Sequence, residues 1–258
     1  TKTSRKKEYK NSVLLDTSEM VNLIKDINKA QYGDKTKIEL PVADYKLVYH
    51  AQNGRTCYTF CMCPGGQVVL SCSEKDSIVT NGMSYADREG DNANAALLVT
   101  LNPRDFPYEG ALGGVTWQEE IEAAAYRVSG SYRAPAQRVE DFLSGRPSQK
   151  AGTVQPTYRP GVTWCDLNQV LPGKITGALK QALPQLEGNL KGFSNHDAVL
   201  TAPETRSSSP VKIVRDESRQ SVLRGLYPTG EGAGYAGGIM SAALDGIQTA
   251  EAIIEALQ

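Results

Sequence analysis

The stretch Gly225–Gln258, GLYPTGEGAGYAGGIMSAALDGIQTAEAIIEALQ, organises the rest of this chain. A short β-rich run, Leu226–Tyr227, leads into a cluster of glycines, and the residues after it have the amphipathic pattern of one long helix. The stretch therefore predicts a strand, a glycine-rich loop and a helix in succession. Elsewhere strand and helix patterns do not alternate regularly, which favours an α+β fold over a simple α/β fold.

The run Gly232–Gly237 formally matches the G-x-G-x-x-G fingerprint of dinucleotide-binding proteins. That fold needs a second strand after the helix, and the residues after Gly237 are helical in pattern throughout. The glycines still allow a ligand to approach the backbone, and N–H groups at a helix start favour an electron-rich ligand. The alternative is a purely structural glycine turn that packs the last helix.

The segment G-L-Y-P-T-G-E-G-A-G-Y-A-G-G-I-M-S-A-A-L-D-G-I (225–247) resembles the closing flavin-binding segment of the uncharacterised bacterial FAD-dependent dehydrogenases. These proteins are relatives of the glutathione-reductase-like flavoproteins. Further blocks of the resemblance follow in order from about residue 31. They are Q-Y-G (31–33), F-C-M-C-P-G-G-Q-V-V (60–69), V-T-N-G-M-S-Y (79–85), N-A-N-A-A-L-L-V (92–99), Y-R-A-P-A-Q-R-V-E-D-F (132–142), D-A-V-L (197–200) and E-T-R-S-S-S-P-V-K-I (204–213).

The resemblance implies that the last strand, glycine loop and helix belong to a glutathione-reductase-like FAD-binding fold. It implies that Glu231 binds the ribitol of FAD and that the amides of Gly237 and Gly238 face the isoalloxazine ring. FAD is the implied cofactor, and NAD(P)H is a candidate electron donor. The cofactor-binding residues implied in this way are Gly230, Glu231, Gly232, Gly234, Tyr235, Ala236, Gly237 and Gly238.

The composition argues against several classes of partner and site. With 28 Lys and Arg against 29 Asp and Glu, the net charge is −1, which gives no reason to expect nucleic acid or an anionic membrane. The sequence has no apolar run of ~18 residues, so we expect a soluble protein. Five cysteines without a C-x-x-C pair favour a reducing cytoplasm and predict no metal site.

The central region predicts an antiparallel meander, because β-rich runs are separated by turn signals at Asn53–Gly54 and Pro64–Gly66. A further buried strand is expected at Ala95–Leu101. The predicted meander strands are 45–49, 57–61 and 68–72, extended by 77–80, and two short extended pieces are expected within 199–214.

Helical patterns occur before and after this meander. Thr116–Glu119 reads as a capping box at a helix start, and Pro172 and Pro184 predict breaks in the longest pattern, because proline removes a donor and clashes inside a helix. The predicted helices are 18–32, 116–128, 136–143 (ended by Gly145) and 167–193 with those two breaks.

Three domains are expected: a basic leader with the first helix (1–30), an inserted substrate-side α+β domain (31–195) and the C-terminal segment of the FAD-binding domain (196–258). Members of the family also carry an N-terminal half, with its own strand–G-x-G-x-x-G–helix, that holds the FAD diphosphate and adenosine. Nothing upstream of Tyr32 matches that half. We expect it to precede this chain in a longer protein or to be supplied by a second polypeptide. We therefore expect this chain alone to be inactive and to retain FAD poorly.

Three residues are candidates for catalysis: Cys61, Cys63 and Arg206. Thiols one residue apart on a strand point to opposite faces, so a disulfide between the two cysteines is not expected. In the functional interpretation, one of the two thiols lies against the flavin. In the alternative, both cysteines are small hydrophobic residues buried before a tight turn. The planar guanidinium of Arg206 could pair with a carboxylate substrate or with the FAD phosphate. In the alternative interpretation, Arg206 and the serines after it form a polar turn whose hydroxyls bind the local backbone.

The leading hypothesis is the C-terminal part of an FAD-dependent oxidoreductase, a dehydrogenase. It would supply the substrate-side domain and the flavin-contacting strand and helix. The competing hypothesis is a non-catalytic binding or assembly module whose glycines serve only to pack the last helix.

Overall fold

The computed structural model describes residues 9–17, 47–206, 208–209 and 211–258. The chain divides into two compact units between Thr205 and Arg206, which we call the sheet unit and the C-terminal unit. The predicted boundary at residue 196 falls inside the sheet unit. The helix predicted at 18–32 lies outside the described residues.

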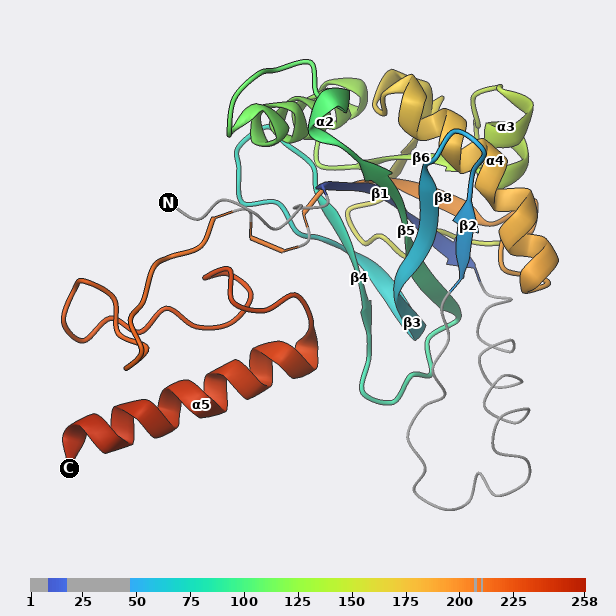
Figure 1. The fold of residues 1–258 in the computed structure, drawn as a ribbon. Coiled ribbons are helices and arrows are strands. Elements are labelled where there is room, and N and C mark those ends of the chain that lie inside the picture. Colours follow the sequence, from blue (N-terminus) through green and yellow to red (C-terminus); the bar gives the residue numbers. More distant parts are fainter. Residues whose placement is uncertain (1–8, 18–46, 207, 210) are drawn as a thin grey trace. The chain divides into compact units, whose positions relative to one another are not determined.

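The sheet unit is built on one eight-stranded sheet with the order β2-β3-β5-β1-β8-β6-β7, in which β4 pairs with β3 (Figure 1). The pairs are antiparallel except β6 with β7, which is parallel. The central strand β5 is almost wholly buried, as its apolar run A-A-L-L-V requires. The strands are β1 (Tyr9–Thr17), β2 (Val48–His50), β3 (Thr56–Leu70), β4 (Thr80–Ser84), β5 (Asn92–Leu101), β6 (Ala134–Arg138), β7 (Val162–Trp164) and β8 (Val199–Glu204).

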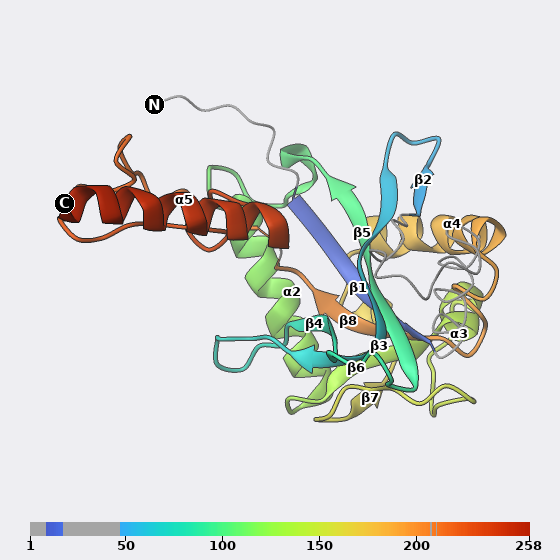
Figure 2. The same ribbon diagram turned by 90° about the horizontal axis from the view of Figure 1, so that it is seen from below.

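The strand β1 occupies the middle of the sheet, where the sequence predicted a basic leader. It pairs with β5 over its whole length and with β8 on its other side. Figure 2 shows it running between these two strands. The apolar run Val13–Leu15 is too short to stand out among basic residues, and pairing with strands more than 70 positions away determines its structure.

The antiparallel pairing of the predicted meander is confirmed for β2 with β3, but the turn predicted at Pro64–Gly66 is wrong, so the strands predicted at 57–61 and 68–72 are one strand. The strand predicted at 77–80 shares only Thr80 with β4. The strand β3 continues through Pro64–Gly66. Its pairing register with β5 shifts twice, between Phe60 and Cys63 and between Cys63 and Gly66. A positive φ of 54° at Gly65 is part of this irregular stretch. Proline and glycine here mark bulges instead of a chain reversal.

The helices of the sheet unit lie together along one side of the strands in Figure 1. The helix α4 packs against β2, β3 and β5, while α2 packs against β6 and β8. One hydrophobic core joins these elements, and Phe142, Leu97 and Leu179 are among its fully buried side chains. The helical elements are η2 (Pro103–Asp105), α2 (Gly113–Ser129), α3 (Val139–Ser144), η3 (Leu167–Gln169) and α4 (Gly173–Asn189).

Several helix predictions are corrected at their ends. The helix α2 begins at Gly113 without a side-chain cap, so the predicted capping box at Thr116 lies within its first turns. The break at Pro172 is confirmed, whereas α4 continues through Pro184. The pattern at 136–143 is divided between β6 and α3, which ends at Gly145 as predicted.

The C-terminal unit contains a long irregular loop and one helix, α5 (Ile239–Leu257). The strand predicted at Leu226–Tyr227 is not formed. Two extended pieces were expected within 199–214, and among the residues described there only β8 is a strand. The fold class α+β is confirmed. A glutathione-reductase-like arrangement of the C-terminal unit stays a prediction.

A substitution at Gly66 tests the irregular strand β3. A Cβ atom at this position would lie 1.9 Å from the carbonyl oxygen of Met83, so Gly66→Ala must displace β4. We expect this variant to lose about 2–3 kcal/mol of unfolding free energy. Gly177→Ala in α4 is the control, because its Cβ would meet nothing within 4 Å, and it should gain up to about 1 kcal/mol. Urea unfolding of both variants measures this, and equal stabilities would contradict the structure of β3.

Candidate functional site

The glycine-rich loop of the C-terminal unit is anchored to α5 by the carboxylate of Asp245. The Arg215 guanidinium donates two hydrogen bonds to it, at 2.6 and 3.0 Å, and Arg219 donates one at 2.7 Å. The backbone N–H of Gly230 donates a fourth, at 2.9 Å. Arg215 also donates to the carbonyl oxygen of Pro228 at 2.7 Å, so that one side chain joins two parts of the loop to each other and to the helix.

This cluster is mostly buried and fixes the charge of its carboxylate. The side chains of Arg215 and Asp245 are 8% and 11% exposed. The hydrogen bonds from Arg215 hold the pKa of Asp245 well below its usual range, against the opposing effect of burial. Arg215 and Arg219 lie in a polar stretch outside the resembling segment, so nothing in the sequence indicated their pairing with Asp245.

The glycines of the loop fall into two groups. Gly230 and Gly234 have φ values of 76° and 82°, and a Cβ at Gly234 would lie 2.5 Å from the carbonyl oxygen of Val211. The backbone itself therefore requires glycine at these two positions. A Cβ at Gly232 would meet nothing within 4 Å.

Gly237 and Gly238 belong to the second group with Gly232. Gly238 is extended, with φ −171°, and a Cβ there would come no closer than 3.9 Å to the hydroxyl of Ser241. A Cβ at Gly237 would meet only the hydroxyl of Ser208, at 3.2 Å. The fold of the C-terminal unit thus does not itself demand glycine at Gly238, and at Gly237 a Cβ requires only a small shift of the Ser208 side chain.

The loop brings Glu231 to the start of α5. The hydroxyl of Ser208 lies 3.5 Å from a carboxylate oxygen of Glu231, and the same hydroxyl faces Gly237. Gly238 is the N-cap of α5 and provides no side-chain cap, so the first amides of the helix are available to another acceptor. The Glu231 carboxylate and the Gly237 backbone thus lie close to one another around the Ser208 hydroxyl, at the start of α5.

Tyr235 is held within its own unit. Its hydroxyl donates to the carbonyl oxygen of Ile213 at 2.9 Å and accepts from the N–H of Arg215 at 3.1 Å. The Arg215 guanidinium lies 3.5 Å from the ring centroid, and the Lys212 ammonium lies 4.2 Å from it. The ring thus orders the loop by cation–π contacts. Its role as a flavin ligand, with that of Ala236, stays a prediction.

The candidate catalytic residues lie in different units: Cys61 and Cys63 in the strand β3, and Arg206 at the start of the C-terminal unit. Cys61 is exposed and has a positive φ of 47°, and the Cys63 thiol donates to its carbonyl oxygen at 3.2 Å. Burial raises the pKa of the Cys63 thiol. All five cysteines lie in the described residues, and none forms a disulfide, as predicted for Cys61 and Cys63. A redox role for the thiols stays a prediction.

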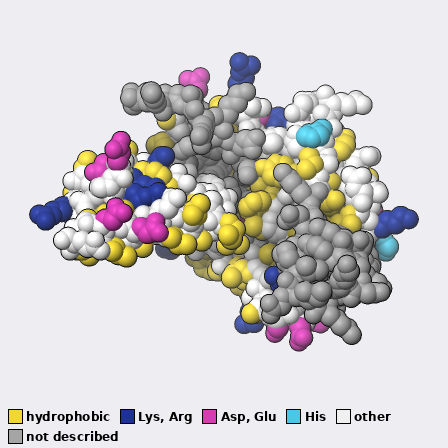
Figure 3. All heavy atoms as spheres, turned by 60° about the horizontal axis from the view of Figure 1, so that its bottom comes forward, with side chains coloured by type: hydrophobic (Ala, Val, Ile, Leu, Met, Phe, Trp, Pro, Cys, Tyr) yellow, Lys and Arg dark blue, Asp and Glu magenta, His cyan; other side chains and the backbone are white. Residues whose placement is uncertain are grey.

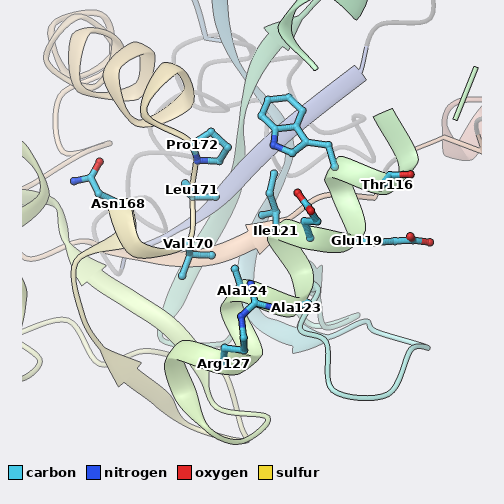
Figure 4. Close-up of a pocket in the computed structure, with 12 residues that line it drawn as sticks. Thr116, Glu119, Ile121, Ala123, Ala124, Arg127, Asn168, Val170, Leu171 and Pro172 are labelled. Atoms are coloured by element: carbon cyan, nitrogen blue, oxygen red, sulfur yellow. The ribbon is translucent and has the colours of Figure 1, made fainter. Parts of the chain in front are cut away.

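The sheet unit also contains an open groove of about 610 Å³ between α2 and the segment that leads into α4, which the sequence did not indicate. Trp117, Ile121 and Leu171 form an apolar floor, and Glu119 and Arg127 are among the charged residues beside it (Figure 4). The Lys174 ammonium and the Phe106 ring flank the indole of Trp117, at 5.4 and 5.7 Å between centres.

Two kinds of site are not found in the part of the chain that the structure describes. None of its His, Cys, Asp and Glu side chains gather in threes in a way that could hold a metal ion. None of its helices is both long and apolar enough to cross a membrane.

The sequence matches the family model for FAD-dependent proteins, C-terminal domain-like, over residues 22–207. The chain belongs to this family. The match covers the sheet unit except β1 and ends two residues into the C-terminal unit. An uncharacterized protein of Clostridium beijerinckii (strain ATCC 51743 / NCIMB 8052) is 47% identical over 233 residues, which are 89% of this chain and 44% of that protein. This member of the FAD-dependent family thus spans less than half the length of its relative.

Because the pKa of Asp245 is lowered, we expect the contact between the loop and α5 to weaken at acid pH. A carboxylate whose pKa is lower in the folded state stabilises that state fully at pH values above its unfolded pKa of about 3.9. This stabilisation is lost progressively as the pH falls from there toward the folded-state pKa. We expect Asp245→Asn to weaken the loop–helix contact by about 3 kcal/mol at neutral pH and to abolish its acid dependence. Hydrogen exchange of the loop amides, with Glu251→Gln as the exposed control on α5, measures both effects. Identical pH profiles in the variant and the unchanged chain would contradict the role of Asp245.

The thiols are expected to differ in reactivity. Burial raises the pKa of Cys57 and of Cys165 to about 11, so both remain protonated and shielded at mildly alkaline pH. We expect a disulfide reagent to modify the exposed Cys61 first and to reach Cys57 and Cys165 only on unfolding. Mass spectrometry of the modified chain gives the order, and early modification of Cys165 would rule out the packing described for it.

Proposed function

We propose that this chain is the C-terminal part of an FAD-dependent oxidoreductase, a dehydrogenase. The sheet unit is its substrate-side domain, and the C-terminal unit provides one wall of the flavin site. The observation that carries the proposal is a group of three glycines, Gly232, Gly237 and Gly238. The backbone conformation does not require glycine at these positions, and the closest neighbour of an added Cβ would be the Ser208 hydroxyl, 3.2 Å from one at Gly237. The absence of side chains leaves their backbone accessible to a ligand. A flat ring that lies against this backbone would account for the three glycines.

The residues at this surface suit the parts of FAD. The Glu231 carboxylate accepts hydrogen bonds from hydroxyl groups such as those of ribitol. The amides of Gly238 and of the first turn of α5, at its positive end, suit an electron-rich ring edge and stabilise negative charge there. The Gly237 N–H donates to the Ser241 hydroxyl at a long 3.4 Å and would exchange this contact for the ring. The flavin, when bound, supplies hydride or electron transfer, with NAD(P)H as a candidate donor. The protein's part is to orient it and to tune its charge.

The proposal includes a partner and a compartment. The FAD diphosphate and adenosine would be held by an N-terminal FAD-binding half, and more than half of the relative's length lies outside its match with this chain. This chain alone should therefore retain FAD poorly. Five cysteines without a disulfide favour a reducing compartment, which we propose to be the cytoplasm.

The glycine substitutions test the proposal in a fusion of this chain with the remainder of the Clostridium relative. We expect the fusion to be yellow. Gly237→Ala should weaken FAD binding about 10–100-fold because its added methyl group holds the ring away from the backbone, and Glu231→Gln should do so by a similar factor because it removes charge-assisted hydrogen bonds worth about 1.5–3 kcal/mol. Gly246→Ala, in the middle of α5 with nothing within 4 Å of its Cβ, should bind FAD like the unchanged fusion. Fluorescence titration with FAD gives the dissociation constants.

A folded fusion that binds no flavin would contradict the proposal. So would Gly237→Ala binding FAD as tightly as Gly246→Ala. Either result would favour the alternative, a non-catalytic assembly module in which the glycine loop only packs α5.

A further inference from the structure

The carboxamide of Asn94, on the strand β5, is buried without a hydrogen-bond partner. Asn94 is 0% exposed, and neither the oxygen nor the nitrogen of its amide has a partner among the residues that the structure describes. Asn92, two positions earlier on the same strand, is also buried, but its amide donates to the carbonyl oxygen of Gln155 at 2.8 Å. A buried polar group without a partner costs free energy, so the unpaired amide of Asn94 needs a cause outside the fold itself.

Asn94 shares its face of the sheet with a thiol and lies close to a hydroxyl. Cys63 of β3 is the register partner of Asn94, and side chains directly opposite one another lie on the same face of a sheet. A Cβ at Gly66 would lie 3.2 Å from the amide nitrogen of Asn94, and Gly66 is in turn the register partner of Ser84 on β4. The Ser84 hydroxyl forms a hydrogen bond with the Cys63 thiol. The carboxamide, the thiol and the hydroxyl therefore meet where β3, β4 and β5 come together.

The sheet curls so that β8 reaches the same place. The Thr80 hydroxyl of β4 donates to the carbonyl oxygen of Pro203 of β8 at 3.0 Å, although the two strands are not neighbours in the sheet order, and Figure 2 shows them side by side. Glu204 follows Pro203 on β8. Burial raises the pKa of the Cys63 thiol, and the charge of the Glu204 carboxylate raises it further, against the hydrogen bond from Ser84. The thiol thus stays protonated at neutral pH, beside a carboxylate.

A second buried polar group without a partner lies on this face of the sheet. Thr201 of β8 is 0% exposed, and within the described part of the chain its hydroxyl has no hydrogen-bond partner. Leu14 of β1 is the register partner of both Thr201 and Ala96, and Ala96 is two residues from Asn94. Because alternate residues of a strand point to the same face, Thr201 and Asn94 belong to one face. The unpaired groups thus share one side of the sheet.

The cluster is open to solvent at one end and carries a negative charge there. Cys63 and Ser84 are partly exposed, whereas Asn94 and Thr201 are buried, so a ligand would enter beside the first two. Among the described residues, the Glu204 carboxylate is the one charge that acts on the Cys63 thiol. An anionic ligand would be repelled there, and a neutral polar one would not.

An asparagine carboxamide is selective in geometry. Its oxygen and one N–H lie on the same edge of a planar group, so it pairs best with a ligand that presents an N–H and an acceptor side by side. Asparagine binds the edge of adenine in this way. A primary amide or a lactam presents a matching edge, whereas a trans peptide bond has its N–H and C=O on opposite sides. A carboxylate has no N–H to donate to Asn94.

We propose that Asn94 binds the amide group of a small neutral ligand, a primary amide or a lactam, which enters beside Cys63 and Ser84. The N–H of the ligand donates to Oδ1 of Asn94, and its carbonyl oxygen accepts from Nδ2. Thr201 is available to a polar group farther along a longer ligand. The inference rests on the proposed function in one respect, because it names this ligand as the substrate of the oxidoreductase. Asn94 is a binding residue here, and no redox step is assigned to Cys63.

Titration of this chain with pyrrolidinone, a small lactam, tests the site without any flavin when it is followed by heteronuclear NMR. We expect pyrrolidinone to shift the side-chain amide signals of Asn94 and to bind with a millimolar dissociation constant, as suits so small a ligand. Cyclopentanone has the same ring size and carbonyl group but no N–H. It should bind at least about tenfold more weakly, because Oδ1 of Asn94 stays unpaired. Asn94→Ala should lose the preference for the lactam, and Asn92→Ala should keep it.

Urea unfolding of the same two variants is a second test. Both changes remove a buried asparagine side chain from β5, but only Asn92→Ala breaks a hydrogen bond within the described structure. We therefore expect Asn94→Ala to lower the urea midpoint less than Asn92→Ala does. An equal or larger fall for Asn94→Ala would show that its amide is already paired within the protein, which contradicts the site.

Three binding results would overturn the proposal: no shift of the Asn94 amide signals by pyrrolidinone, equal binding of the two ring compounds, or unchanged lactam binding by Asn94→Ala. In the fusion with the remainder of the Clostridium relative, Asn94→Ala should bind FAD as tightly as the unchanged fusion. Weaker FAD binding would assign the carboxamide to the flavin ring and overturn the amide site. A fusion that binds no flavin, made from a chain that binds pyrrolidinone, would refute only the proposed function and leave the amide site standing.

Discussion

The hydrogen bonds of Asp245 are the interaction on which the C-terminal unit depends. A unit with almost no apolar core cannot be ordered by hydrophobic burial, so a buried carboxylate, two arginines and the Gly230 amide take over that role. Such a cluster is costly to form and specific in geometry, because each charge must meet its partners. It fixes the loop on one side of α5 and sets the positions of Glu231 and the glycines at the helix start.

The same constraint explains why the two units differ in character. The sheet unit satisfies the usual rules, with a buried central strand β5 and helices whose apolar residues face the sheet. The C-terminal unit reverses them, because its helix presents apolar residues outward and polar ones inward. Figure 3 shows hydrophobic side chains on the surface of this unit.

Much of the sheet could be predicted, since the run A-A-L-L-V at β5 and the alternating runs of the meander carry their own pattern. The strand β1 could not, because pairing with distant strands and not local pattern determines it. At the candidate site, sequence singled out Glu231 and the glycines, and the structure brings Glu231 beside Gly237. The partners of Asp245 were missed, because Arg215 and Arg219 are 30 and 26 residues away from it in sequence and no periodicity connects them.

The most direct measurement of the central claim is a structure of the longer protein crystallised with FAD. We expect the amides of Gly237 and Gly238 to lie within hydrogen-bond distance of the isoalloxazine ring, and the Glu231 carboxylate to accept hydrogen bonds from the ribitol hydroxyls. A structure in which this backbone packs against protein, while the flavin binds elsewhere, would contradict it.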